Sequence, residues 1–282
     1  MNGVPLHLER RGSGPALMLL HGFTGSGRSM AGVAQAFERE YEILAPDLPG
    51  HGRSDVPFRS SDYGFNDCVD DLLATIAAAG HARTHLLGYS MGARVALGFA
   101  VRHPASVATL ILVGPRAGIS DPDKRAARRR ADEALAARIE TEGVEKFVDE
   151  WMAQPVVATQ RNLGPEFFAQ ARRDRLANSA QGLAASLRRL GPGAQPPLFD
   201  ALPHMTAPTL LVAGALDREF VESAHDLARR MPRAEVCEIA DAGHAAHLEQ
   251  PEAFVRAVQE FLRRAEGPEP SIRPIPVQET PS

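Results

Sequence analysis

The sequence of 282 residues lacks the features that mark disulfide-rich, membrane-spanning or secreted proteins. It contains only two cysteines, Cys68 and Cys237, which are too few for a disulfide framework and lack the spacing of a metal site. No apolar run approaches the roughly 20 residues of a transmembrane helix. Residues 1–11 carry charges and a proline where a signal peptide needs an apolar core. We therefore expect a soluble, cytoplasmic protein with free thiols.

An excess of one charge sign is also missing. The chain has 31 Lys and Arg against 35 Asp and Glu, for a formal net charge of −4. This balance gives no overall attraction to nucleic acid or to anionic membranes. We expect a small-molecule partner, with no nucleic acid and no membrane insertion, and the sequence leaves both a monomer and a homo-oligomer open.

What the sequence does contain is a regular alternation of short apolar runs and helical patterns. The expected strands cover residues 16–20, 41–45, 84–87, 107–113, 209–213 and 234–239. Continuous apolar runs of this kind are typical of parallel strands that are covered on both faces. Between them, the stretch 66–79 places Val69, Leu72 and Ile76 on one helical face, and 91–102 and 252–264 are further helix candidates. The expected fold class is α/β, with a mostly parallel sheet flanked by helices.

The segment 120–201 breaks this alternation, because it is rich in Ala, Arg and Glu and contains no convincing strand. Its apolar positions suit two short helices, and they are Leu135, Ile139, Phe147, Val148 and Trp151. We expect a helical cap over the carboxyl edge of the sheet, with 191–197 (GPGAQPP) as the return linker. The core then comprises residues 1–119 and 202–266, and the proline-rich residues 267–282 form a disordered tail.

The sequence around Ser90 has the pattern of a nucleophile elbow. Gly88-Tyr89-Ser90-Met91-Gly92 follows an expected strand and opens an expected helix, which is the context this motif requires. Ser90 would stand at the carboxyl end of the strand, and the backbone N–H of Met91 would point at a developing oxyanion. A second N–H donor is expected from Phe23, in the loop after the first apolar strand. The alternative interpretation of that loop is a plain glycine turn.

The partners of such a serine follow it in the order Asp, His. Asp217 and His244 each come directly after an expected strand, at the edge of the sheet where sites gather in α/β proteins. Asp217 would orient the imidazole, and His244 would take the proton of Ser90. Asp241 is an alternative carboxylate, and His247 is expected at the surface or behind the site.

Two polar segments have ordinary explanations. The loop 47–54 (DLPGHGRS) has the glycines and the proline of a turn with a structural role. The basic run 124–130 is interpreted as a solvated helix face. Alternatively, it aims one or two guanidinium groups at an anionic substrate.

These motifs resemble the α/β-hydrolase superfamily, and more closely the 2-succinyl-6-hydroxy-2,4-cyclohexadiene-1-carboxylate (SHCHC) synthases of menaquinone biosynthesis. The resemblance covers residues 2–264 almost continuously. Its most specific parts are Arg94 after the elbow, the arginines of the cap and the linker 191–198. Ala93 stands where many members have a third glycine, and the tail has no counterpart. Further matching segments are LHGFTGS (20–26), FVDEWMAQP (147–155), GALDREF (214–220) and AGHAAHLEQP (242–251).

The resemblance implies a lyase that eliminates pyruvate from 2-succinyl-5-enolpyruvyl-6-hydroxy-3-cyclohexene-1-carboxylate (SEPHCHC). In this reaction the triad acts as a general base, and no metal, nucleotide or other cofactor is needed. The substrate carries several carboxylates, which Arg94, Arg128 and Arg175 would bind, and Tyr89 and Trp151 would line the pocket. Helix phase leaves open whether Arg128 or one of its two following arginines faces the pocket.

Two other functions remain open. In the first, Ser90 is a true nucleophile of an esterase or a carbon–carbon bond hydrolase. Such an enzyme would favour an apolar pocket over three convergent guanidinium groups. In the second, the protein is a non-enzymatic binding or signalling member of the fold, against which the intact Ser, Asp and His argue.

Overall fold

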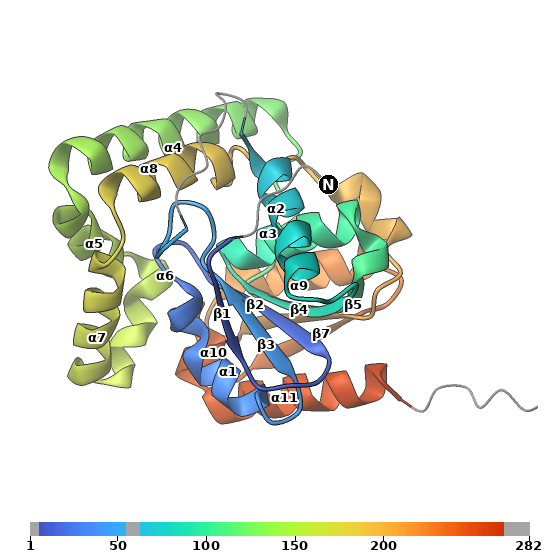
Figure 1. The fold of residues 1–282 in the computed structure, drawn as a ribbon. Helices are drawn as coiled ribbons and strands as arrows, with labels where there is room; N and C mark the ends of the chain where they lie inside the picture. Colours follow the sequence, from blue (N-terminus) through green and yellow to red (C-terminus); the bar gives the residue numbers. More distant parts are fainter. Residues whose placement is uncertain (1–5, 55–62, 268–282) are drawn as a thin grey trace, which may run out of the picture.

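The computed structural model describes residues 6–54 and 63–267 and shows a seven-stranded sheet between layers of helices (Figure 1). The strand order is β1-β3-β2-β4-β5-β6-β7. The strands are β1 (Leu8–Arg11), β2 (Ala16–Leu20), β3 (Glu42–Pro46), β4 (Thr84–Tyr89), β5 (Val107–Val113), β6 (Thr209–Gly214) and β7 (Ala234–Ile239). All neighbouring pairs are parallel except β1 and β3. The expected α/β class with a mostly parallel sheet is confirmed.

The edge strand β1 was not expected from the sequence. Its four residues, LERR, include a single apolar side chain, and the last two are exposed. It pairs antiparallel with β3, so that Arg10 lies opposite Leu44. Charged side chains on a short edge strand hinder pairing with other chains. Because of these charged residues, the strand lacks the apolar pattern by which strands are predicted from a sequence.

Helices cover both faces of the sheet, and each face has its own hydrophobic core. Along β2, Met18 and Leu20 belong to one core, whereas Leu17 and Leu19 belong to the other, as the period-two alternation of a strand requires. The first core packs against α2 (Phe65–Ala78), α3 (Met91–Arg102) and α9 (Arg218–Arg230). The second packs against α1 (Ala31–Phe37) and α11 (Pro251–Ala265). The single-turn helix α10 (Ala246–Glu249) precedes α11.

Between β5 and β6 the chain forms a run of helices that Figure 1 shows above and beside the sheet. They are α4 (Pro122–Glu142), α5 (Val144–Met152), α6 (Pro155–Ala158), α7 (Pro165–Leu176) and α8 (Ala180–Leu190). The expectation of two short helices was wrong, because α4 alone spans 21 residues. Its Ala, Arg and Glu residues are strong helix formers, and Asp121 caps its first turn, so few apolar positions are needed.

A third hydrophobic cluster lies among helices α4 to α8, a segment that we refer to as the cap. Its buried members are Ala136, Ile139, Phe147, Val148, Met152, Leu183, Ala184 and Leu187. Phe23, from the loop after β2, packs against both this cluster and the first core of the sheet. The cap therefore has its own interior and meets the core at the loop that carries Phe23.

Two further contacts join the cap to the core loops. Asn178, between α7 and α8, donates its side-chain N–H to the Thr24 carbonyl at 2.9 Å and accepts the Gly52 N–H at 2.9 Å. The backbones of Gly50 and Gly182 are in close contact. A Cβ on Gly182 would lie 2.5 Å from the Gly50 oxygen. No larger side chain fits either position without movement of one backbone.

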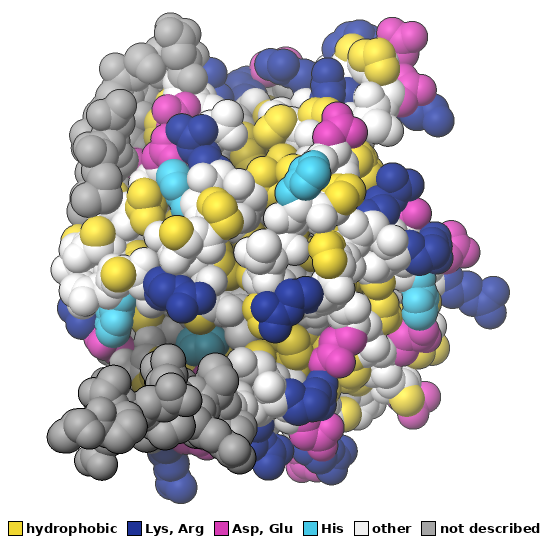
Figure 2. Space-filling view, turned by 90° about the vertical axis from the view of Figure 1, so that its right-hand side faces the viewer, with side chains coloured by type: hydrophobic (Ala, Val, Ile, Leu, Met, Phe, Trp, Pro, Cys, Tyr) yellow, Lys and Arg dark blue, Asp and Glu magenta, His cyan; other side chains and the backbone are white. Residues whose placement is uncertain are grey.

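Within residues 6–54 and 63–267, none of the helices is both long and apolar enough to span a bilayer. Figure 2 shows a face on which basic, acidic and apolar side chains are interspersed. On the described part of that face, neither charge sign forms a continuous field. The predicted disordered tail lies, apart from Gly267, outside the described residues.

Candidate active site

Ser90 lies on the sharp turn between β4 and α3. Its backbone has φ 53° and ψ −106°, a conformation that L-residues rarely adopt. The flanking glycines make this turn possible, because a Cβ on Gly88 would lie 2.3 Å from the Gly92 oxygen. A Cβ on Gly92 would in turn lie 2.2 Å from the Leu20 oxygen. The turn therefore presents the Ser90 hydroxyl at the carboxyl end of the sheet.

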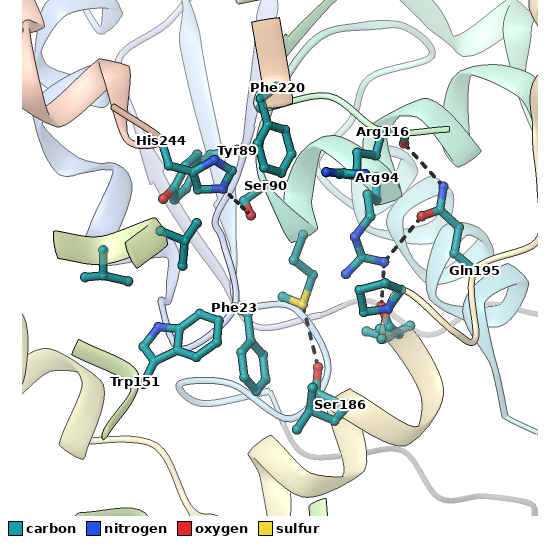
Figure 3. A pocket seen from close by; sticks show the side chains of 18 of the residues that line it. Phe23, Tyr89, Ser90, Arg94, Arg116, Trp151, Ser186, Gln195, Phe220 and His244 are labelled. Carbon is teal, nitrogen blue, oxygen red and sulfur yellow. Dashed lines mark hydrogen bonds between the residues drawn. The ribbon is translucent and has the colours of Figure 1, made fainter. Parts of the chain in front are cut away.

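The three residues proposed as a triad lie in hydrogen-bond contact. The Nε2 of His244 is 2.9 Å from the Ser90 Oγ (Figure 3). Its Nδ1 is 2.8 Å from the Asp217 Oδ2. A carboxylate on Nδ1 selects the tautomer whose Nε2 can accept the serine proton. Asp241, the alternative carboxylate, is exposed, and it is Asp217 that contacts the imidazole.

Several residues that sequence reasoning missed hold His244 in place. The Phe220 ring lies 4.4 Å from the imidazole, centroid to centroid. Gly114 passes so close that a Cβ there would lie 2.8 Å from His244 Cε1. Glu249 accepts the N–H groups of Gly243 and Ala245, at 2.7 and 3.1 Å, and so braces the loop on both sides of His244. No local motif marks these roles.

His247 is buried behind the site, so the option of a surface position was wrong. Its ring lies 4.5 Å from the Tyr89 ring, and only 5% of the residue is exposed. Burial, and secondarily the nearby His244, lowers the pKa of His247 to about 3. It is therefore a neutral packing group at physiological pH. Tyr89 itself lies between the two imidazoles and lines the pocket.

The loop that carries Phe23 is braced by the segment 47–54. His21 accepts the Leu48 N–H on its Nε2 at 2.9 Å, and His51 accepts the Thr24 N–H at 3.2 Å. Desolvation lowers the pKa of both imidazoles, that of His51 to about 3. The segment 47–54 thus fixes the position of the loop that carries Phe23. Phe23 and Met91, the expected N–H donors, line the same pocket as Ser90.

This pocket has a volume of about 430 Å³ and lies between the sheet edge and the cap. Figure 3 shows Arg94 and Trp151 on opposite sides of Ser90. All five residues expected to bind substrate line it, and they are Tyr89, Arg94, Arg128, Trp151 and Arg175. Of the three consecutive cap arginines, Arg128 is the one that lines the pocket.

Each of the three arginines expected to bind substrate donates hydrogen bonds to other residues of the protein. Arg94 is buried and donates from Nη1 to the Leu190 carbonyl at 2.8 Å. Burial, followed by repulsion from Arg128, lowers the pKa of Arg94 to about 10, which leaves it charged at neutral pH. Arg128 donates to Asp132 at 2.7 Å. These contacts preorganise the guanidinium groups toward the cavity.

Arg175 lies in α7. Its side chain donates to the Ala171 carbonyl at 2.9 Å and to the Gln160 side chain at 3.2 Å. Burial lowers its pKa. Gln195, from the predicted linker, is fully buried and accepts a long hydrogen bond of 3.5 Å from Arg94. Gln160 and Gln195 were not expected as lining residues, although the QPP run marked the linker that carries Gln195.

The lower wall of the pocket is aromatic. The rings of Phe23 and Trp151 meet edge to face, with centroids 5.5 Å apart. Trp151 also packs against Phe147 at 5.9 Å. A cavity with an apolar floor, a serine and several fixed cations suits a rigid, carboxylated small molecule. Among the described residues, no cluster of three His, Cys, Asp or Glu side chains could hold a metal ion.

The chain is similar to proteins of known family over most of its length. The family model described as alpha/beta hydrolase fold matches residues 15–251. The SHCHC synthase of Yersinia pestis (strain Pestoides F) is 34% identical, over 92% of this chain and 91% of the relative. That of Escherichia coli O1:K1 is 32% identical, over 88% of this chain and 94% of the relative.

Solved structures give the same result. The structure of MenH from S. aureus superposes with a TM-score of 0.87 at 30% identity, covering 93% of this chain and 99% of that one. A thermophilic esterase from Thermogutta terrifontis, solved with malate bound, has a TM-score of 0.81 at 31% identity, with 93% and 94% of the two chains covered. The resemblance expected from the motifs is confirmed.

Proposed function

This chain belongs to the α/β-hydrolase family and, within it, to the family of the SHCHC synthases, and on that premise we propose that it eliminates pyruvate from SEPHCHC to give SHCHC in menaquinone biosynthesis. The observation that carries the proposal is a single cavity in which Ser90 faces fixed guanidinium groups. A substrate with several carboxylates needs such cations, whereas a neutral ester does not.

In the proposed mechanism, Ser90 acts as a base instead of a nucleophile. His244 accepts the hydroxyl proton, and the Ser90 oxygen removes the proton of ring carbon C2, which carries the succinyl group and neighbours the carboxylate-bearing C1. The electrons of that C–H bond form the C2=C3 double bond, the former C3=C4 double bond shifts to C4=C5, and the bond between C5 and the enolpyruvyl oxygen breaks. Pyruvate leaves as its enolate, which takes up the proton held by His244, while Ser90 keeps the proton from C2. The N–H groups of Phe23 and Met91 stabilise the enolate-like charge that develops on the ring substituent.

The binding residues follow from the same geometry. Arg94, Arg128 and Arg175 would together bind the carboxylates of the substrate, and the Trp151 and Tyr89 rings would flank the cyclohexene ring. Residues 120–201 would form the cap that closes the cavity over the core. The reaction as proposed calls on protein groups alone.

The test is to mix purified protein with enzymatically generated SEPHCHC and to follow the ultraviolet absorbance of the diene and the release of pyruvate. We expect acceleration above the spontaneous rate, and Ser90→Ala should lower kcat by roughly 10³-fold or more. Asp241→Asn is the matched control, because this exposed carboxylate lies in the loop before His244 without serving as its partner. A Ser90→Ala variant with undiminished turnover would contradict the proposal.

A second candidate is ester hydrolysis with Ser90 as the nucleophile. The similarity to the malate-bound esterase favours it, because that protein shares the fold at comparable identity. In this case a para-nitrophenyl ester would be cleaved with a burst of para-nitrophenol, whereas SEPHCHC would not react faster than it does alone. The two assays together separate the candidates.

A further inference from the structure

An ion pair at the mouth of the pocket has no part in the mechanism above. Arg116 follows β5, Glu219 lies in the first turn of α9, and their side chains form a salt bridge. Both line the pocket, with 39% and 73% of the side chains exposed. Glu219 also lines a second hollow of about 400 Å³ that shares Trp151, Phe220 and His244 with the pocket. The pair therefore lies where the cavity opens to solvent.

The charges around the cavity are unequal. Among the described residues that line it, four are arginines and Glu219 alone carries a carboxylate. The mechanism assigns three of the arginines, and these three are anchored by carbonyl groups, an amide or a carboxylate of the cap. Arg116 is the fourth, and its side-chain partner is the most exposed carboxylate of the site. Such a pair contributes little to stability, so its purpose is better sought in binding.

The position of Arg116 is fixed independently of Glu219. Its guanidinium carbon lies 4.6 Å from the centroid of the Phe220 ring, which in turn packs at a tilt against His244. Its backbone carbonyl accepts a 3.5 Å hydrogen bond from Gln195, the amide that also contacts Arg94. The cation–π contact would hold the guanidinium near the reactive centre after Glu219 is displaced.

We propose that Arg116 binds the outermost carboxylate of the substrate. In the free protein, Glu219 forms a salt bridge with Arg116, and the substrate carboxylate displaces it on binding. The exchange replaces one carboxylate by another, so the charge of Arg116 stays paired throughout. Glu219 then weakens the binding of any ligand without a carboxylate at this position, and the pair selects polycarboxylates. The inference rests on the proposed function, whose substrate it describes in more detail.

Steady-state kinetics with SEPHCHC test this role. We expect Arg116→Met, which keeps an apolar contact with Phe220, to raise KM about tenfold while kcat changes by less than about twofold. Glu219→Gln should lower KM about threefold, because it removes the competing carboxylate. In the Arg116→Met background, Glu219→Gln should have no further effect, which is the coupling that a shared role requires.

The matched control is the Arg264–Glu235 pair, whose exposure is similar and whose members do not line the pocket. Arg264→Met and Glu235→Gln should leave KM unchanged. If Arg116→Met and Glu219→Gln also left KM unchanged, the proposed role of Arg116 would be wrong and the pair would be an ordinary surface contact.

Binding of tricarballylate, a stable tricarboxylate, separates this inference from the proposed function. A wild-type protein that does not accelerate SEPHCHC elimination would overturn the proposed function alone. Calorimetric titration of the same preparations would still compare tricarballylate affinities. An affinity about tenfold weaker in Arg116→Met than in wild type supports the carboxylate role, and equal affinities overturn it.

Discussion

Arg94 shows what a single buried cation can contribute to this site. One nitrogen of its guanidinium is held by the Leu190 carbonyl, and the residue, only 8% exposed, lines the pocket one helical turn after Ser90. Its pKa, lowered to about 10 by burial, still leaves it charged at neutral pH. A buried cation whose hydrogen bonds within the described residues go to a carbonyl and an amide oxygen is well suited to accept a carboxylate from a ligand.

Replacing Arg94 should therefore separate the two candidate reactions. We expect Arg94→Ala to lower kcat/KM for SEPHCHC about 100-fold, since a buried charge-assisted contact would be lost. Hydrolysis of a small neutral para-nitrophenyl ester, if present in the wild type, should be spared. Equal losses of both activities would show that the variant has disturbed the elbow and would count against a carboxylate-binding role.

Residue patterns along the sequence predicted the parts of the site that depend on short-range order. The elbow around Ser90, and the positions of Asp217 and His244 after strands, follow from local motifs and chain order. Glu249, Gln195 and Arg116 could not be found in this way, because their roles arise only when distant loops meet. A glutamate five positions after a histidine is common, and only the fold shows that it braces the loop.

At the scale of elements, the buried parallel strands and amphipathic helices were predicted well. α3 has the predicted bounds and β7 also, because glycines, prolines and apolar runs mark their ends. β1 was missed for lack of apolar side chains, and α4 was underestimated since its length depends on intrinsic helix propensity. Elements that lie at an edge or on the cap carry the weakest hydrophobic patterns.

The contact between α8 and the 47–54 loop is an element-level feature that a single methyl group can test. Gly182→Ala would place a Cβ 2.5 Å from the Gly50 oxygen. We expect this variant to lower the free energy of unfolding by about 1–3 kcal/mol and to raise KM, because α8 also carries lining residues. Urea denaturation and steady-state kinetics measure the two effects.

Gly32→Ala is the control, because Gly32 lies in α1 and a Cβ there would meet no atom within 4 Å. Helix propensity alone favours alanine over glycine, so this variant should be neutral or more stable by up to about 1 kcal/mol. If Gly182→Ala were equally harmless, the cap would tolerate displacement from the core at this contact.

For the whole molecule, the buried imidazoles link stability to pH. Desolvation lowers the pKa of both His51 and His247 from 6.5 to about 3. Between these values the unfolded chain binds more protons than the folded protein, so stability is fully present above about pH 6.5 and is lost as the pH falls toward 3. Each such imidazole should contribute a loss of about 2 kcal/mol between about pH 7 and about pH 5.

His51→Gln should reduce this acid sensitivity. Glutamine can accept the Thr24 N–H without titrating, so the loss of unfolding free energy between about pH 7 and about pH 5 should shrink by about 2 kcal/mol. Urea unfolding at the two pH values measures the difference. His225→Gln serves as the control, because its side chain is 48% exposed and lies on the surface. An unchanged pH dependence in His51→Gln would show that other groups cause the acid loss.

The first turn of α9 has a consequence for redesign. Asp217, its N-cap, contacts the imidazole, Glu219 pairs with Arg116, and Phe220 packs at a tilt against His244. In the proposed roles, one helical turn combines the proton-transfer chemistry with the choice of ligand. A combinatorial library confined to residues 218 and 219, with Asp217 and Phe220 left intact, would sample new preferences for acids at the entrance while the reactive centre stays assembled.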